Sequence, residues 1–437
     1  MSANLLSRAN IRKIYKMVVR FQKTIKYHLF QKKKISSMIQ NHVEIRSPNS
    51  RKILAIYFDG LPAKRLDLYG GIIPVPNFKK LAERGTLYNN YIVTAPSTAM
   101  TMTSMFTGLF PHEFGRYSWS KSDTSLPEHV IPLIEILSSE GFEMYFLWDE
   151  EFMTRRTQNK YKIINWEEYN INFLDIANKE IQTKQTTDML TKLSKSNINK
   201  WFCFVRFSDT ASSKYIGSAK SYSPYSFDDE VIEADAILGK LLETVDDSVD
   251  IIVFSDHGKC YGERGLFKYA FNLAETTLHV PLICSWGNGK VVDDLTSVVE
   301  FPNIILQNVI RKHKYLYADT AYAHQWNRNT MIRDGRWKYT YNRIGWPVPE
   351  EFYDLKYDAS EQINLIGTYK DPYRDSRPKG DTASNKFSPS GLSLDGKDVS
   401  EVYPRNDWAQ IRKKIKELRN ERERIWLLQG VDERNYG

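Results

Sequence analysis

Little in this 437-residue chain indicates a disulfide-bonded or membrane-spanning protein. It has three cysteines, Cys203, Cys260 and Cys284, which form neither an even set nor the paired spacing of a zinc knuckle, so we expect three free thiols. No run approaches the roughly 20 apolar residues that a membrane-spanning helix needs. The first residues also lack the apolar stretch and small-residue cleavage site of a secretory signal. We therefore expect a cytoplasmic protein.

Acidic residues are absent from positions 1–34, whereas lysine and arginine are frequent there. Because the formal net charge of the whole chain is +8, the remainder is slightly acidic, which argues against a nucleic-acid partner. Apolar residues recur in this segment every three or four positions, as on one face of a helix. They are Ile11, Ile14, Val18, Phe21, Ile25 and Leu29. Such a basic amphipathic helix can lie on an anionic membrane surface, dock on a partner or cover its own domain. For a cytoplasmic protein the membrane surface would be the inner face of the membrane.

Short apolar runs alternate with helical patterns along most of the chain. This alternation is typical of an α/β fold with a mostly parallel sheet that helices cover on both faces. Strands are predicted at 53–58, 143–148, 201–207 and 251–255. Helices are predicted at 76–84, 98–107, 127–139, 182–195 and 226–246.

Beyond about residue 330 the pattern changes to short alternating segments at 337–341 and 352–355, which predict a small antiparallel subdomain. Polar residues dominate 367–403, and a charged helix with one apolar face follows from Asp407. The predicted divisions are a basic N-terminal segment (1–50), an α/β domain (51–330), a small C-terminal subdomain with an irregular loop (331–403) and a terminal helix (404–437).

Acidic residues come just after three of the predicted strands. Asp59, Asp209 and Asp256 hold these positions, and His257 comes next to Asp256. Ligands gather beyond the carboxyl ends of strands in open α/β sheets, so these side chains can share one edge. Carboxylate and imidazole ligands suit one divalent cation, whether zinc, manganese, calcium or magnesium. The alternative for the pair at 256 and 257 is a turn cap beside a surface histidine.

Thr98 stands where a turn enters an apolar helix. A hydroxyl there is usually a cap, a role that Ser97 can also fill. The same position concentrates backbone N–H groups and the positive end of the helix dipole, which favour a tetrahedral anion and a lower hydroxyl pKa. A bound metal would complete the activation of the hydroxyl.

The sequence resembles the sulfatase branch of the alkaline phosphatase superfamily over roughly residues 52–366. Five strings in the family's order carry this resemblance: 53–60 with 69–70 and 76–85, then 106–112, then 255–258, then 262–268 with 280–282, and finally 332–339 with 352–365. The resemblance implies an alkaline-phosphatase-like fold and one metal held by Asp59, Thr98, Asp256 and His257. It also implies a phosphorylated or sulfated small molecule or glycan as the substrate.

This sequence departs from the sulfatase pattern at the nucleophile. Sulfatases carry Cys or Ser followed by Pro two and Arg four residues later, whereas counting back from Thr107 and Gly108 places Thr98 there, with Met100 and Met102 behind it. Formylglycine is therefore not expected. A threonine resembles the phosphoethanolamine and phosphoglycerol transferases of the superfamily.

Further departures concern the groups around the metal. Gly60 replaces a second ligand aspartate, and Arg264 replaces a histidine common in sulfatases. Asp209 is followed by Thr210 and Ala211, where the family would place a histidine.

The resulting hypothesis is a metal-dependent hydrolase or transferase of phosphate mono- or diesters that works through a covalent phosphothreonine at Thr98. Lys268 would neutralise a non-bridging oxygen, and Arg264 and His279 are further catalytic candidates. Candidate substrate-binding residues are His112, Asp209 and His324, and His324, like His279, is also a candidate general acid. Two alternatives stay open: a sulfatase that uses an unmodified threonine, and a catalytically degenerate member that binds glycans.

Overall fold

The structure of the protein is a computed structural model. The structure describes residues 50–114, 130–148, 170–173, 179–207, 225–261, 263–269, 272–320, 329–342, 349–368, 393–394, 397–398 and 407–428. Among these, no helix is long and apolar enough to cross a membrane. The three cysteines are buried and free, as the sequence predicted.

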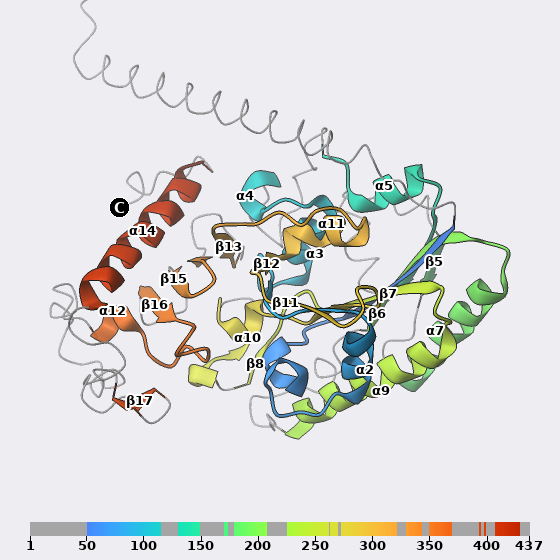
Figure 1. The fold of residues 1–437 in the computed structure, drawn as a ribbon, viewed down its shortest axis with the longest axis horizontal. Helices are drawn as coiled ribbons and strands as arrows, with labels where there is room; N and C mark the ends of the chain where they lie inside the picture. Colours follow the sequence, from blue (N-terminus) through green and yellow to red (C-terminus); the bar gives the residue numbers. More distant parts are fainter. Residues whose placement is uncertain are drawn as a thin grey trace, which may run out of the picture.

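A large, mostly parallel sheet forms the body of the described chain (Figure 1). Its strand order is β11-β2-β10-β7-β1-β6-β4-β5. Strand β1 (Arg51–Phe58) lies between β6 (Lys200–Phe207) and β7 (Val249–Phe254) and is parallel to both. Strands β4 (Glu143–Trp148) and β5 (Asn170–Phe173) continue in parallel beyond β6, whereas β10 (Leu282–Cys284) is antiparallel to β7 and to β2 (Thr86–Tyr88). The edge strand β11 (Lys290–Val292) pairs in parallel with β2.

Both faces of the central strand are apolar, because side chains alternate between the faces of a strand. Ile53, Ala55 and Tyr57 belong to one buried cluster, and Leu54 and Ile56 belong to the other. Helices on both faces bury these clusters. Helices α2 (Pro76–Arg84), α7 (Lys179–Lys195) and α9 (Tyr225–Thr244) cover one face, and α3 (Thr98–Thr107), α5 (Leu133–Ser139) and α11 (Phe301–Ile305) cover the other (Figure 1).

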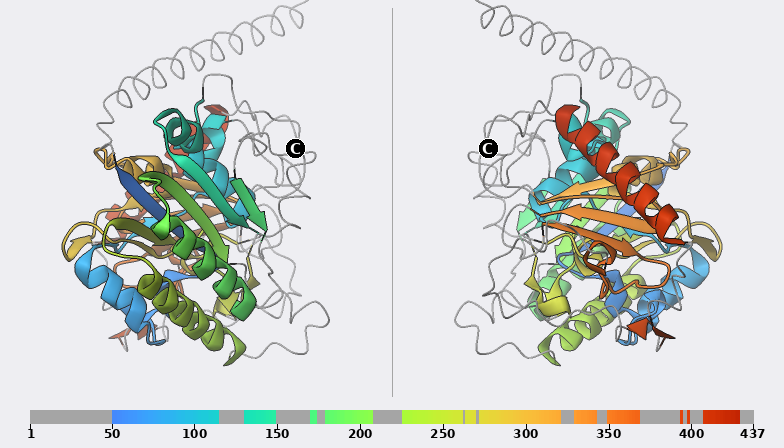
Figure 2. Two further views of the ribbon diagram at one scale, coloured as in Figure 1. Left: turned by 90° about the vertical axis from the view of Figure 1, so that its right-hand side faces the viewer. Right: turned by 90° about the vertical axis from the view of Figure 1, so that its left-hand side faces the viewer.

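A small antiparallel sheet stands beside the body (Figure 2). Its strands run in chain order: β13 (Leu316–Asp319), β14 (Thr330–Arg333), β15 (Trp337–Tyr341) and β16 (Glu350–Asp354). Helix α14 (Asp407–Leu428) packs across β14 and β15 and buries Ile411, Leu418 and Ile425. The shorter helices are α4 (Pro111–Phe114), α10 (Glu275–Leu278) and α12 (Leu365–Thr368). The shorter strands are β3 (Tyr91–Ile92), β8 (Cys260–Tyr261), β9 (Phe267–Lys268), β12 (Thr296–Ser297), β17 (Ser393–Leu394) and β18 (Lys397–Asp398).

The structure confirms the predicted fold class. Predicted helix bounds agree to the residue for α2 and α3, and predicted strands agree to within two residues at either end of the central strands. The polar loop at 369–392 lies outside the described residues, as do 127–129 of the helix predicted at 127–139. Residues 130–132 are described and are not helical, because α5 begins at Leu133 after Pro132, so the predicted start was too early.

A buried group of charges joins the small sheet to the body. The Glu275 carboxylate of α10 accepts from Arg333 Nη1 at 2.5 Å and from Lys338 Nζ at 3.0 Å. Lys338 Nζ also lies 2.7 Å from Glu361 Oε1, and Glu361 Oε2 accepts from the Glu275 backbone N–H. Burial alone would raise the pKa of Glu275, but Arg333 and Lys338 outweigh burial and hold that pKa well below its usual range.

We expect Glu275→Gln to lower the free energy of unfolding by about 3 kcal/mol, because it leaves two buried cations with one carboxylate. The folded-state pKa of Glu275 lies below the unfolded value near 4.5, so its stabilisation is present above about pH 4.5 and is lost as the pH falls below it. Urea unfolding at pH 7 and pH 4 measures both effects. The control is Asp188→Asn, which breaks the exposed Lys184–Asp188 pair and should change stability by less than about 1 kcal/mol. Equal losses in both variants would contradict the prediction.

Candidate metal centre

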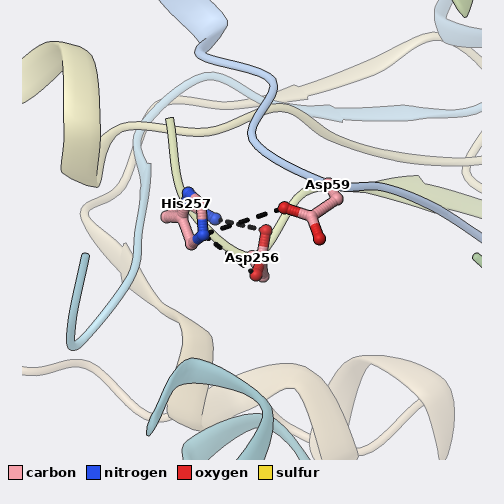
Figure 3. Close-up of side chains that lie close together, drawn as sticks. All are labelled: Asp59, Asp256 and His257. Atoms are coloured by element: carbon pink, nitrogen blue, oxygen red, sulfur yellow. Dashed lines mark hydrogen bonds and ion pairs between the residues drawn. The ribbon is translucent and has the colours of Figure 1, made fainter. Parts of the chain in front are cut away.

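Three metal-ligand side chains meet at the carboxyl ends of the central strands. Asp59 directly follows β1, and Asp256 and His257 follow β7 after one residue. Because β1 and β7 are parallel neighbours, their carboxyl ends lie at the same edge of the sheet. One ligand atom from each of the three residues lies within 4.8 Å of the others. Figure 3 shows the two carboxylates and the imidazole pointing toward one another.

The second polar atom of each of these side chains is held by the protein. Asp256 Oδ1 accepts from the backbone N–H groups of His257 at 2.9 Å and Gly60 at 3.3 Å. His257 Nδ1 lies 3.1 Å from the Gly258 carbonyl oxygen, to which it can only donate. Asp59 Oδ2 accepts from Arg206. These contacts leave Asp59 Oδ1, Asp256 Oδ2 and His257 Nε2 facing one point, because hydrogen bonds to the far atom of a metal ligand fix the direction of the near one.

These atoms fit a cation. His257 Nε2 lies 3.4 Å from Asp256 Oδ2 and 3.8 Å from Asp59 Oδ1. With Nδ1 protonated, the neutral imidazole turns the lone pair of Nε2 toward two carboxylates. Asp256 Oδ2 is buried and has no hydrogen-bond donor of good geometry among the described residues, although the hydroxyl groups of Tyr57 and Thr98 lie close to this carboxylate. A buried carboxylate oxygen without a donor is costly, and a divalent cation would satisfy all three atoms at once.

Thr98 approaches the metal-ligand residues from helix α3, which covers one face of the large sheet. It is the first residue of α3, and its Oγ1 lies 3.4 Å from His257 Nε2. The first backbone N–H groups of a helix have no partner within the helix. Ser97 occupies the N-cap position, but its side chain makes no capping hydrogen bond. The start of α3 therefore offers backbone donors and a hydroxyl at the metal-ligand group.

Two cations that the sequence analysis did not single out adjoin Asp59. Arg206 comes from the end of β6, opposite Tyr57 in the register, and pairs with Asp59 Oδ2. Lys259 follows Gly258 and is 5% exposed. A lone arginine in the apolar strand at 201–207 was a signal for the first. Nothing in the sequence distinguished Lys259 from a surface lysine.

The pKa values of the two carboxylates are shifted in opposite directions. Burial alone would raise the pKa of Asp59, but Arg206, His257 and Lys259 hold it well below its usual range. Burial raises the pKa of Asp256, and the charge of Asp59 raises it further. Burial also lowers the pKa of Lys259 to about 8. Perturbed groups concentrated at one sheet edge are typical of functional sites.

Other predicted site residues make contacts elsewhere. Arg264 pairs with Glu351 and lies 3.4 Å from Glu361, on the side of the small sheet. His279 Nε2 lies 2.9 Å from the Asn89 carbonyl oxygen, and burial lowers the pKa of His279 to about 4.

His112 stacks on Phe110 with ring centroids 5.6 Å apart and meets Tyr317 edge-on at 5.1 Å. None of these contacts of His112, Arg264 and His279 involves a metal-ligand residue. Their proposed roles stay predictions.

Several predictions fall outside the described residues. Asp209 and His324 lie there, as does the basic segment at 1–34. Lys268 belongs to β9 and pairs with Cys260 through the backbone, but its side chain is not described.

Comparison with known proteins gives a family match. The family described as Sulfatase matches residues 51–309. Choline-sulfatase from Rhizobium meliloti (strain 1021) is 26% identical over 169 residues, a match that covers 32% of this chain and 32% of that protein. The chain thus matches about a third of the length of this curated relative.

Solved structures share the fold. A 2-O GAG sulfatase aligns with a TM-score of 0.59 at 16% identity, over 75% of this chain and 89% of that chain. The phosphonate monoester hydrolase of Agrobacterium radiobacter aligns with a TM-score of 0.56 at 14% identity, over 74% and 93% of the two chains.

Proposed function

Because the chain belongs to the sulfatase family, we propose that it is a metal-dependent hydrolase of phosphate-type esters that uses Thr98 as its nucleophile. The observation that supports this most is the 3.4 Å approach of Thr98 Oγ1 to His257 Nε2 at the start of α3. A hydroxyl placed there meets both the metal ligands and the helix N-terminus.

The chain's own residues have separate tasks in this proposal. Asp59, Asp256 and His257 would hold one divalent cation, with Thr98 as a further ligand. When bound, that cation would lower the pKa of the Thr98 hydroxyl and offset negative charge on the substrate. The backbone N–H groups at the start of α3 would donate to non-bridging oxygens of the ester.

The reaction has two displacements. In the first, Thr98 Oγ1 gives up its proton and forms a bond to phosphorus, the bond to the leaving oxygen breaks, and that oxygen takes up a proton. In the second, the oxygen of water bonds to phosphorus, the bond to Thr98 Oγ1 breaks, and the threonine hydroxyl regains a proton. An acceptor hydroxyl in place of water would make the same site a transferase.

Sulfate esters are the second candidate substrates. A sulfate ester has the same tetrahedral shape, and the same two displacements apply with sulfur in place of phosphorus. The names of the relatives favour this alternative, since choline-sulfatase and a 2-O GAG sulfatase are among them. The phosphonate monoester hydrolase favours the phosphate-type reading. A sulfated or phosphorylated glycan or small molecule is the proposed substrate class in either case.

The test compares aryl phosphate, phosphodiester, phosphonate monoester and aryl sulfate substrates with Mn²⁺, Zn²⁺, Ca²⁺ or Mg²⁺ added to chelator-treated protein. We expect turnover that requires a metal and is fastest on a phosphorus ester. Faster turnover of the sulfate would support the second candidate instead. Absence of turnover on all four classes, in protein that binds metal, would favour a glycan-binding member without catalysis.

A further inference from the structure

The Lys259 side chain fills the space that a side chain at residue 60 would need. A Cβ added at residue 60 would lie 2.5 Å from Lys259 Cε and 3.0 Å from Lys259 Nζ. Gly60 also has a φ of +77°, where a side chain would be strained. The buried position of the Lys259 side chain thus depends on the absence of a side chain at residue 60.

This contact places the lysine ammonium beside the metal ligands. Residue 60 follows Asp59, and its backbone N–H donates to Asp256 Oδ1 at 3.3 Å. Since a Cα–Cβ bond is about 1.5 Å long, Lys259 Nζ lies within roughly 4.5 Å of the Gly60 Cα. The ammonium also lies 6.0 Å from the centroid of the Tyr269 ring, which stacks on His257 at 4.2 Å. Lys259 is therefore close to Asp59, whose pKa it helps to lower.

Two described cations lie beside Asp59. Arg206 pairs with its carboxylate, and Lys259 helps to hold its pKa below the usual range. Lys179, at the start of α7, is a further cation, but Glu233 and Glu230 lie near it. A divalent cation bound beside Asp59 would also lie near the buried ammonium of Lys259, and repulsion between two buried cations is costly. An oxyanion that binds at the same time removes this cost.

We propose that Lys259 couples metal binding to oxyanion binding, so that the metal binds tightly only together with a tetrahedral anion. This inference deepens the proposed function, because it relies on the same metal centre, but it does not depend on Thr98 as nucleophile. Coupling between two ligands is reciprocal and typically amounts to 5–150-fold in affinity. We expect inorganic sulfate or phosphate to raise the affinity for Mn²⁺ at least tenfold.

The experiment titrates chelator-treated protein with Mn²⁺ by calorimetry, with and without inorganic sulfate or phosphate. Lys259→Met should bind Mn²⁺ about tenfold more tightly than the wild type when no anion is present, and the anion effect should fall below about threefold. Lys184→Met, which removes an exposed lysine of α7, should retain the full coupling. Equal Mn²⁺ affinity with and without both anions in the wild type would overturn the proposal.

Gly60→Ala provides a second route, because the added methyl group displaces Lys259 while the lysine is retained. It should weaken the coupling, and the double variant with Lys259→Met should weaken it no further. The same titrations on Thr98→Ala separate the two proposals. If the anions do not change Mn²⁺ affinity in the wild type, but turnover still requires Thr98, only the role of Lys259 is overturned. If the anions do raise Mn²⁺ affinity, but Thr98→Ala retains full turnover, only the role of Thr98 as nucleophile is overturned.

Discussion

Replacing Thr98 by alanine is expected to reduce kcat/KM on the best substrate by at least about 10⁴-fold, because the atom that attacks the ester is removed. Thr98→Ser keeps the hydroxyl at the start of α3 and should stay within about tenfold of the wild type. Steady-state kinetics with metal present measures both variants. Intact-mass analysis of protein mixed with substrate should also detect a phosphate or sulfate adduct that is absent from Thr98→Ala.

The matched control for this prediction is Thr103→Ala. Thr103 lies in the same helix and is also buried, but its Oγ1 donates to the Ala99 carbonyl oxygen at 2.7 Å. Its removal should change kcat/KM by less than about threefold. If Thr98→Ala and Thr103→Ala lose similar activity, Thr98 is not the nucleophile.

The helix limits, the central strands and the meeting of Asp59 with Asp256 could be predicted because local sequence patterns determine them. The limits of α3 agree with the predicted helix because Ser97 precedes its apolar run and Gly108, in a left-handed conformation, ends it. The strands on either side of β1 carry continuous apolar runs that only a sheet buried on both faces accommodates. Because Asp59 and Asp256 stand just after such strands, their convergence also follows from the parallel order.

The charges around Asp59 could not be predicted in the same way. Arg206 reaches Asp59 because β6 neighbours β1 in the sheet, and strand order is a tertiary property that no local pattern records. Lys259 reaches the centre because Gly60 leaves room for it, which depends on the relative placement of two loops. Conversely, Arg264 lies within the family-like string at 262–268, yet its partners are Glu351 and Glu361 of the C-terminal part. A positive φ of 56° at Arg264 helps to direct the chain there.

Replacing Asp256 by asparagine should abolish metal binding while making the metal-free protein more stable. The amide oxygen can still accept from the backbone N–H groups of Gly60 and His257, which now bond to Asp256 Oδ1. The amide nitrogen would then stand where Oδ2 lies 3.4 Å from His257 Nε2, and it can donate to that lone pair. The variant thus removes a buried charge and fills a missing hydrogen bond, which we expect to add about 1–3 kcal/mol to stability.

Thermal unfolding with and without Mn²⁺ plus inorganic sulfate measures both effects. The wild type should gain stability with the added ligands, following the mass action of binding to the folded state, whereas Asp256→Asn should show a higher midpoint that the ligands no longer change. The control is Asp247→Asn, whose side chain is 95% exposed beside Arg84, and which should respond to the ligands as the wild type does. A variant that is less stable than the metal-free wild type would mean that Asp256 serves the fold rather than a cation. A full ligand response in Asp256→Asn would mean that the cation, if bound, does not use this carboxylate.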